Sequence, residues 1–308
     1  MTLPDFPRTA EGRVYHLGLK HGELAPRIVT VGDPSRALKL AEEFEGGRES
    51  VKVESDRGFL TLTGIYKGVR LSIVAIGMGF ANMDFFVREC RECVDGDMFI
   101  IRFGSCGCLS DLDQPTGMSG AHYISHLPDF HIPIKAYADD RLHEILAGTL
   151  NNAVPRDSKV RVDHEAVNAS TDSFYSSQGR ITSFPDHNEN LLEFLIDRVP
   201  GIISLEMETF HLLHLASAYR PTGDLTVQVN SETGPMPTFP LTSLPTSNPT
   251  VSNRSPSVQV DNSRGRIHAC SAQMVFASRS TNAFITPEEV QQTQAWTGLA
   301  CLEALTLV

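Results

Sequence analysis

The sequence predicts an α/β fold in which helices cover both faces of a sheet. Apolar runs typical of buried strands alternate with segments of helical periodicity over most of the chain, and no internal repeat is visible. Of the 308 residues, 41% are hydrophobic, which is enough for a large core. We therefore expect a single domain over residues 1–308. It carries a polar insertion at about 233–263, where Pro, Ser, Thr and Asn replace the large apolar residues.

The charge balance limits the partners that the chain can bind. Its formal net charge is -11, from 26 basic and 37 acidic residues, which is the wrong sign for general nucleic-acid binding. Any anionic ligand must therefore meet a local group of arginines. No apolar run approaches ~18 residues, and the N-terminus lacks the apolar stretch of a signal peptide. We expect a cytoplasmic protein that binds neither membrane nor nucleic acid.

The first strand, turn and helix indicate an anion site. Residues 27–31 form an apolar strand that ends at Gly32-Asp33-Pro34, a sharp turn in which the proline suits the first helical position. The helix that follows runs through Leu40 to Phe44. Arg36 lies in its first turn, where a cation is normally unfavourable, and this choice makes sense if an anion also binds there.

A hairpin and a second glycine turn follow. Alternating runs at 59–64 and 69–76 flank a glycine turn and predict antiparallel strands. Arg57 precedes them, and a solvated turn position explains it equally well. The sequence GMGFAN at 77–82 then opens a helix and invites a dinucleotide interpretation. Asn82 stands where that motif has Gly or Ala, so the motif is weak.

The next apolar strand carries an arginine. Residues 98–103 predict a buried strand that ends in Gly104 and Gly107, with Arg102 at the strand end and Ser105 between the glycines. Unpaired N–H groups in such a turn, together with a guanidinium, predict a pocket for an anion at the sheet edge. An ordinary strand and turn with a solvated arginine fits this stretch equally well.

The six cysteines raise the question of a zinc site. Cys90 and Cys93 lie in a helical pattern, whereas Cys106 and Cys108 lie at a strand end, and zinc ribbons place both pairs on short turns. We therefore expect free thiols packed as small apolar groups, and no metal.

The middle of the chain contains a loop suited to a flat heteroaromatic ligand. After a predicted strand at 160–167, residues 170–180 combine Phe174, which can stack, with Gln178 and Arg180, which offer an amide and a fork of donors. A surface loop without a ligand has the same composition.

The remaining elements complete the alternation. Residues 201–205 predict a strand that leads into Glu206-Met207-Glu208 and a helix. Carboxylates at such a junction favour the helix dipole and can also hold sugar hydroxyls. The other predicted elements are a helix over 139–152, a strand over 225–230, an ambiguous run at 269–276 and a helix from the cap Thr286 to about 305.

In combination, these motifs resemble those of the uridine phosphorylases, members of the nucleoside phosphorylase family whose sites form between two subunits. The resemblance covers roughly 13–230 and the C-terminal helix. It implies a three-layer α/β/α sandwich with a mixed central sheet. The segments that carry it are Tyr15-His16-Leu17-Gly18-Leu19, Gly32-Asp33-Pro34-Ser35-Arg36, Arg102-Phe103-Gly104-Ser105, Phe174 with Gln178-Gly179-Arg180, and Glu206-Met207-Glu208.

The resemblance also implies a role for each site residue. Those that would hold phosphate are Gly32, Arg36, Arg102 and Ser105, with Arg57 from the neighbouring subunit. Those that would contact the ribose are Met207, Glu208 and the neighbour's His16, which by itself would count as an ordinary hydrogen-bonded histidine. Those that would bind the base are Phe174, Gln178 and Arg180. The residues that would act most directly in catalysis are Arg102, Arg180 and Glu208.

The implied reaction is the reversible phosphorolysis of uridine to uracil and ribose 1-phosphate. Phosphate would attack the anomeric carbon of an oxocarbenium-like sugar while Arg180 stabilises charge on the leaving base. Inorganic phosphate is then a co-substrate, and no cofactor is needed. We expect a homodimer, because the 233–263 insertion lies where bacterial members are short and would block assembly into a hexamer.

Two positions depart from the family pattern. Ser231 follows Asn230 where the family often has an arginine, so one contact to the base is lost or comes from elsewhere. Gly58 stands where bacterial members have a glutamate that helps to bind a cation at the interface, so such a cation is not predicted.

Three alternatives stay open. A purine nucleoside phosphorylase or a nucleosidase of the same family is disfavoured by Gln178 and Arg180. A dinucleotide-dependent oxidoreductase rests only on Gly77-Met78-Gly79. A protein that binds nucleosides without turning them over would need the same residues.

Overall fold

The structure is a computed structural model, and it describes residues 6–109, 116–124, 135–158, 160–219, 265–281 and 283–308, with the backbone alone for 116–124. Its strands are β1 (Arg27–Val31), β2 (Val51–Glu54), β3 (Leu60–Tyr66), β4 (Val69–Ala75), β5 (Met98–Cys108), β6 (Thr116–Ile124), β7 (Lys135–Tyr137), β8 (Ala166–Thr171), β9 (Ile202–Glu206) and β10 (Ile267–Ser278). Its helices are α1 (Pro34–Ala41), α2 (Phe80–Arg91), α3 (Asp140–Ala153), α4 (Leu191–Arg198), α5 (Thr209–Ala218) and α6 (Pro287–Thr306), with short 3-10 turns η1 (Glu45–Gly47) and η2 (Ser176–Gln178).

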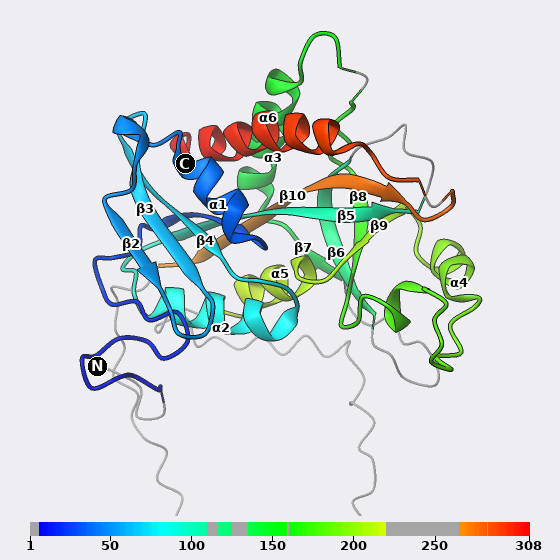
Figure 1. Cartoon of the computed structure of the whole chain (residues 1–308), viewed down its shortest axis with the longest axis horizontal. Coiled ribbons are helices and arrows are strands. Elements are labelled where there is room, and N and C mark those ends of the chain that lie inside the picture. Colours follow the sequence, from blue (N-terminus) through cyan, green and yellow to red (C-terminus); the bar gives the residue numbers. More distant parts are fainter. Residues whose placement is uncertain (1–5, 110–115, 125–134, 159, 220–264, 282) are drawn as a thin grey trace, which may run out of the picture.

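Two layers of helices enclose the sheet, as the sequence predicted (Figure 1). Helices α1, α3 and α6 lie on one face, and α2 and α5 lie on the other. Each interface has its own apolar cluster, one containing Phe44 and Phe103 and the other Phe86 and Met98. None of the helices in the described ranges has the length and apolar character needed to span a membrane.

The sheet is mixed and partly closes on itself. β1 pairs in parallel with β4 and β5, whereas β2, β3 and β4 form an antiparallel meander. Beyond β5, the pairings β5–β9, β9–β8, β8–β6, β6–β10 and β10–β5 form a closed ring. The long strands β5 and β10 therefore belong to this ring, and β5 also joins it to the open part of the sheet.

Side-chain alternation along β5 sets the position of the site. Ile101 and Phe103 pack on the side of α1 and α6, whereas Ile100 packs on the side of α2 and α5. Because successive side chains of a strand alternate, Arg102 shares the face of Ile100. On the adjacent strand β10, Ser271 lies opposite Arg102. A polar patch is therefore built into one face of a largely apolar sheet, next to the start of α5.

Both predicted helix starts with a cap signal are confirmed. Pro34 is the first residue of α1, and Asp33 Oδ1 accepts hydrogen bonds from the backbone N–H groups of Ser35 and Arg36 at 2.7 and 3.1 Å. Thr286 caps α6 in a capping box, in which Thr286 and Glu289 each bond the other's backbone N–H. The sequence therefore placed the turn that carries Arg36 correctly.

The prediction that the strand at 98–103 stops in a glycine turn is wrong. β5 continues to Cys108, because β10 pairs with it along its whole length. Gly104 and Gly107 are therefore strand residues, and Arg102 lies within the strand rather than at its end. The ambiguous run at 269–276 is the middle of β10.

The strand predicted at 160–167 is also displaced. β8 begins at Ala166, because Asp163 Oδ1 accepts from the N–H of Glu165 at 3.0 Å and forms a local turn before the strand. The predicted strand at 225–230 and the predicted insertion at 233–263 lie outside the described residues.

Candidate active site

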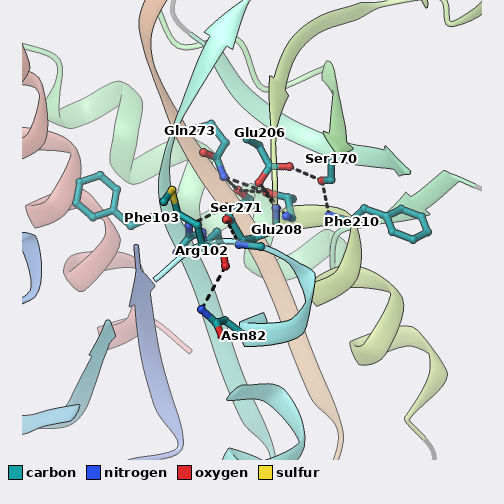
Figure 2. Close-up of polar contacts among 12 residues, drawn as sticks. Asn82, Arg102, Phe103, Ser170, Glu206, Glu208, Phe210, Ser271 and Gln273 are labelled. Carbon is teal, nitrogen blue, oxygen red and sulfur yellow. Dashed lines mark hydrogen bonds and ion pairs between the residues drawn. The ribbon is translucent and has the colours of Figure 1, made fainter. Parts of the chain in front are cut away.

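A buried ion pair forms the centre of the site (Figure 2). Arg102 Nη2 donates to Glu208 Oε2 at 2.9 Å, and the two side chains are 4% and 6% exposed. Arg102 belongs to β5, and Glu208 directly precedes α5. Removing two charges from water is costly unless each is paired, so the pair fixes both side chains.

A second arginine lies beside Arg102. The Arg36 guanidinium lies over the Phe103 ring, 5.4 Å from its centroid, and donates to the Phe103 carbonyl at 3.4 Å. Burial and the charge of Arg102 lower the pKa of Arg36 to about 10, so Arg36 remains charged at neutral pH. Among the described residues, Nε and Nη1 of Arg102 and Nε of Arg36 are buried without a hydrogen-bond partner. Such donors on adjacent guanidinium groups suit an oxyanion.

Gly32, Arg102 and Ser105, three of the residues predicted to hold phosphate, lie near the point where β5 changes its partner. β1 pairs with residues 99–102 of β5 and β9 pairs with 107 and 108, so residues 103–106 lie between the two partners along that edge. Gly32 follows β1, and a Cβ built on it would lie 3.5 Å from Arg102 Nη2. Ser105 is an exposed residue of this stretch. Ligands of open α/β sheets bind at such switch points.

The glycine turn before α2 holds the other oxygen of Glu208. The N–H of Gly79 donates to Glu208 Oε1 at 2.7 Å. Gly79 has a φ of 91°, a conformation that favours glycine. The motif that invited a dinucleotide interpretation thus positions a carboxylate.

Glu206 is buried, and its carboxylate accepts hydrogen bonds at the start of α5 (Figure 2). Its Oε2 accepts from the backbone N–H groups of Glu208 and Thr209 at 2.8 and 2.9 Å, and from the Thr209 hydroxyl at 2.9 Å. Its Oε1 accepts from Asn168 Nδ2 at 2.6 Å and from the Ser170 hydroxyl. Burial and the charge of Glu208 raise the pKa of Glu206, and these hydrogen bonds oppose the rise. Because this carboxyl group already accepts from N–H groups at the start of α5, the donors available to an oxyanion are those of Arg36 and Arg102.

Met207 lies between the two glutamates in the chain. It is half-buried, whereas Glu206 and Glu208 are buried. Of the three residues in this motif, Glu208 is the one hydrogen-bonded to Arg102. Met207 keeps part of its surface accessible to a ligand.

Arg180 contacts both of the other residues predicted to bind the base, Phe174 and Gln178. Arg180 Nη1 donates to Gln178 Oε1 at 2.6 Å and to the Phe174 carbonyl at 2.5 Å. Gln178 Nε2 donates to Thr171 Oγ1 at 2.9 Å. The Arg180 guanidinium also lies over the Phe174 ring, 3.6 Å from its centroid. It therefore covers one face of that ring, and a base can stack on this face only if the arginine moves.

Sequence reasoning missed Arg279. This residue directly follows β10, and its Nη2 donates to the carbonyls of Gln178 and Gly179 at 3.0 and 3.4 Å. Burial lowers the pKa of Arg180 to about 10, and the charge of Arg279 adds to the shift. Ser231 stands where the family often has an arginine, and Arg279 is an arginine at a strand end beside residues 178 and 179. The available signal was the run at 269–276, which is followed two residues later by Ser278-Arg279.

A chain of hydrogen bonds joins the two halves of the site. Thr171, at the end of β8, lies within 3.2 Å of the Glu206 carbonyl and accepts from Gln178. Glu206 in turn holds the N–H of Glu208, the partner of Arg102. Residues 174–180 follow β8 and Glu208 follows β9, so the base-binding residues and the carboxylate of the ion pair lie beyond the ends of two adjacent strands.

His16 and Arg57 belong to a separate cluster around Tyr15. Arg57 Nη2 donates to the Tyr15 hydroxyl at 2.7 Å, and its guanidinium lies 5.1 Å from the Tyr15 ring centroid. His16 Nδ1 lies 2.6 Å from Glu89 Oε1 of α2. The structure thus brings these two predicted residues together through Tyr15.

The cysteines are not arranged as metal ligands. All six are buried free thiols, and burial raises the pKa of Cys90, Cys106 and Cys270, which disfavours the thiolate that metals need. In the described ranges, no group of three His, Cys, Asp or Glu side chains is placed to hold a metal ion.

Comparison with known proteins identifies the family. The model of the phosphorylase superfamily matches residues 26–221. The chain is 30% identical to a uridine phosphorylase of Thermococcus kodakarensis, over 69% of this chain and 75% of that protein. It is 29% identical to a DeoD-type purine nucleoside phosphorylase of Oceanobacillus iheyensis, over 66% of this chain and 81% of that protein.

A solved structure supports the same conclusion. It comes from an analysis of two diverse uridine phosphorylases in the oomycete Phytophthora capsici, and it matches with a TM-score of 0.78 and 32% identity over 98% of both chains. The predicted fold class is therefore confirmed. The predicted enzyme class is confirmed as well, because nucleoside phosphorylases are pentosyltransferases. A family model that matches most of the chain shows that this protein belongs to the phosphorylase superfamily.

Proposed function

We propose that this chain catalyses the phosphorolysis of uridine to uracil and ribose 1-phosphate, with inorganic phosphate as co-substrate and no resident cofactor. The observation that carries the proposal is the presence of two arginine pairs at the two ends of one hydrogen-bonded framework. Arg36 and Arg102 have buried, unpartnered donors suited to phosphate. Arg180 donates to the Gln178 side-chain amide and Arg279 donates to the Gln178 backbone carbonyl, and the donor and acceptor of that side chain suit the polar edge of uracil.

The ion pair accounts for how the two substrates would be aligned. Glu208 is held by Arg102 and Gly79, and each carboxylate oxygen retains a lone pair that can accept from a ribose hydroxyl. Arg102 would then contact phosphate and the ribose-binding carboxylate at once. Fixing a nucleophile and its target in this way removes much of the entropic barrier to their reaction.

The chemical step follows from this alignment. A phosphate oxygen forms a bond to the anomeric carbon as the bond from that carbon to N1 of uracil breaks, and the electron pair leaves with the base. Arg180 stabilises the charge on the departing uracil anion, which takes its proton from water. For Arg180 to do so, it must leave its contact with the Phe174 ring, so that the base stacks where the guanidinium lies.

We also propose that the working unit is a homodimer in which each site is completed by its neighbour. His16 and Arg57 are bonded to Glu89 and Tyr15, in a cluster separate from the arginine pairs. Their proposed roles toward ribose and phosphate therefore belong to the partner's site. Closed two-fold assembly is the commonest form of homo-oligomer.

The decisive test is an absorbance assay with uridine and with inosine, each with and without inorganic phosphate. We expect loss of uridine that depends on phosphate, and little loss of inosine. Arg102→Ala should lower kcat/KM for uridine by about a hundredfold, the effect of removing one transition-state donor. Arg48→Ala is the matched control, because Arg48 is an exposed arginine after η1, and it should leave the rate unchanged.

Each other result of this assay would indicate a different activity. Cleavage of uridine without phosphate would make the enzyme a nucleosidase. Preference for inosine would make it a purine nucleoside phosphorylase, the class of the Oceanobacillus iheyensis relative. Binding of uridine without turnover of either nucleoside would overturn the proposed reaction altogether.

A further inference from the structure

Glu89 is a buried carboxylate that binds the N-terminal arm, which comprises residues 6–26 before β1. It lies on α2 and is 3% exposed. Its Oε2 accepts from the backbone N–H of Leu17 at 2.7 Å, and the backbone N–H of His16 lies within 2.9 and 3.0 Å of its two oxygens. Its Oε1 also lies 2.6 Å from His16 Nδ1. One carboxylate therefore holds both the backbone and the ring of His16.

These contacts define which ring nitrogen carries the proton. A carboxyl group that accepts from backbone N–H groups with both oxygens is stabilised in its ionised form, and an ionised carboxylate can only accept. The short contact to His16 must then be a hydrogen bond donated by Nδ1–H. In a neutral imidazole the proton on Nδ1 leaves Nε2 with a free lone pair. His16 therefore offers Nε2 as a hydrogen-bond acceptor.

Aromatic contacts also fix the orientation of the His16 ring. It stacks on Phe85 of α2 with centroids 3.7 Å apart and an interplanar angle of 10°. Tyr15 meets it edge-on at 5.1 Å and carries Arg57 on its hydroxyl. The ring can neither flip nor tilt without breaking these contacts, so Nε2 points in a set direction.

We propose that Glu89 is a positioning residue that sets the tautomer of His16, so that Nε2 accepts a hydrogen bond from the 5′-hydroxyl of a nucleoside bound in the partner's site. This inference rests on the proposed function, because it assigns His16 to the ribose of a neighbouring subunit. It goes beyond that function in naming Glu89 and the direction of the hydrogen bond. A nucleoside without a 5′-hydroxyl would gain nothing from Glu89.

Glu89→Gln isolates the effect on the tautomer. A glutamine can keep Oε1 on the backbone N–H of Leu17 and turn its amide N–H toward His16 Nδ1. The ring must then accept at Nδ1, and the proton moves to Nε2. Glu92→Gln is the matched control, since Glu92 also lies at the end of α2 and holds the same arm through Arg8 at 3.1 Å.

The first measurement is independent of activity. Two-bond 1H–15N correlation spectra at about pH 8, where an ordinary histidine is neutral, should show His16 with its proton on Nδ1 in the natural protein and in Glu92→Gln. The proton should be on Nε2 in Glu89→Gln. A natural protein with the proton on Nε2 would overturn the proposal, whatever the enzyme's substrate.

The second measurement compares uridine with 5′-deoxyuridine. Glu89→Gln should lower kcat/KM for uridine by about three- to tenfold, the effect of one hydrogen bond, and should leave 5′-deoxyuridine unchanged. In a His16→Ala background, Glu89→Gln should have no further effect. Equal losses for both nucleosides, or a loss that persists without His16, would show a purely structural role. If neither nucleoside is turned over, the proposed function fails, and the spectra still decide the tautomer.

Discussion

Arg102 and Glu208 neutralise each other's charge in the interior of the protein. Both side chains are almost fully buried, and among the described residues Glu208 is the only hydrogen-bond partner of the Arg102 guanidinium. A buried charge that loses its partner is far more costly than a buried pair that is removed together. The stability of the chain should therefore report on this pair even without substrate.

Arg102→Ala should lower the free energy of unfolding by about 3 kcal/mol, because Glu208 is left as an uncompensated buried charge. Arg102→Ala combined with Glu208→Gln should recover part of that loss. Urea unfolding of the three proteins measures both differences. A double variant as unstable as Arg102→Ala alone would contradict the argument.

Arg279 acts on the Gln178 loop rather than on the phosphate arginines. It donates to two successive carbonyls of that loop. Arg279→Ala should therefore raise KM for uridine, with kcat/KM falling about tenfold as one or two hydrogen bonds are lost. The KM for phosphate should not change. Arg156→Ala, at an exposed position, serves as the control in the same initial-rate assay. Equal losses for both substrates would show that Arg279 supports the whole site.

At the scale of elements, the sequence predicted features that depend on local contacts better than features that depend on strand pairing. Asp33-Pro34 and Thr286 fix helix starts through contacts within a few residues, and the structure confirms both. The end of β5 depends instead on β10, more than 150 residues later in the chain, whose pairing turns Gly104 and Gly107 into strand residues. Contacts at that separation leave no local pattern, so the sequence indicated a turn.

Gly104 is needed because Gln273 of β10 crosses its face. A Cβ built on Gly104 would lie 2.3 Å from Gln273 Oε1 and 2.8 Å from Nε2. Gln273 Nε2 donates to Thr209 Oγ1 and Ser271 Oγ at 2.9 and 2.8 Å, so it cannot move without loss. Gly104→Ala should cost about 1–3 kcal/mol of stability. Thermal unfolding measures it, and Gly148→Ala, where a Cβ meets no neighbour, is the control.

Asp139, at the start of α3, should make the free energy of unfolding depend on pH in the acid range. Burial disfavours ionisation of Asp139, but hydrogen bonds from the Leu142 N–H and from His268 outweigh it and lower the pKa of this carboxyl. A lowered pKa gives stability above the ordinary aspartate range that is lost as pH falls through the folded pKa. Asp139→Asn keeps the cap and removes the charge. It should be less stable than the natural chain at about pH 5 and equal to it well below about pH 4. Urea midpoints across this range test the prediction.

At the scale of the whole molecule, the order of the motifs along the sequence was enough to recognise the family. It was not enough to find every residue of the candidate site. The motifs from Gly32 to Glu208 precede the long polar segment, and in the structure Arg102 bonds to Glu208 while Gln178 bonds to Thr171. Arg279 follows that segment, whereas the family pattern placed the expected arginine at the position of Ser231. A strand-end arginine is found only when its strand is known, and β10 is assigned by its pairing with β5.

Sharing of sites between subunits can be tested by mixing two defective proteins. Arg36→Ala removes a phosphate contact of the subunit that holds the site, and Arg57→Ala removes the contact proposed to come from its partner. Each variant alone should lose most activity. After they are unfolded and refolded together, random pairing should restore about a quarter of the natural activity, because each mixed dimer has one site free of both changes. Sedimentation equilibrium on the same sample checks that the particles are dimers. If the mixture is no more active than its components, Arg57 acts within its own subunit and the composite site is wrong.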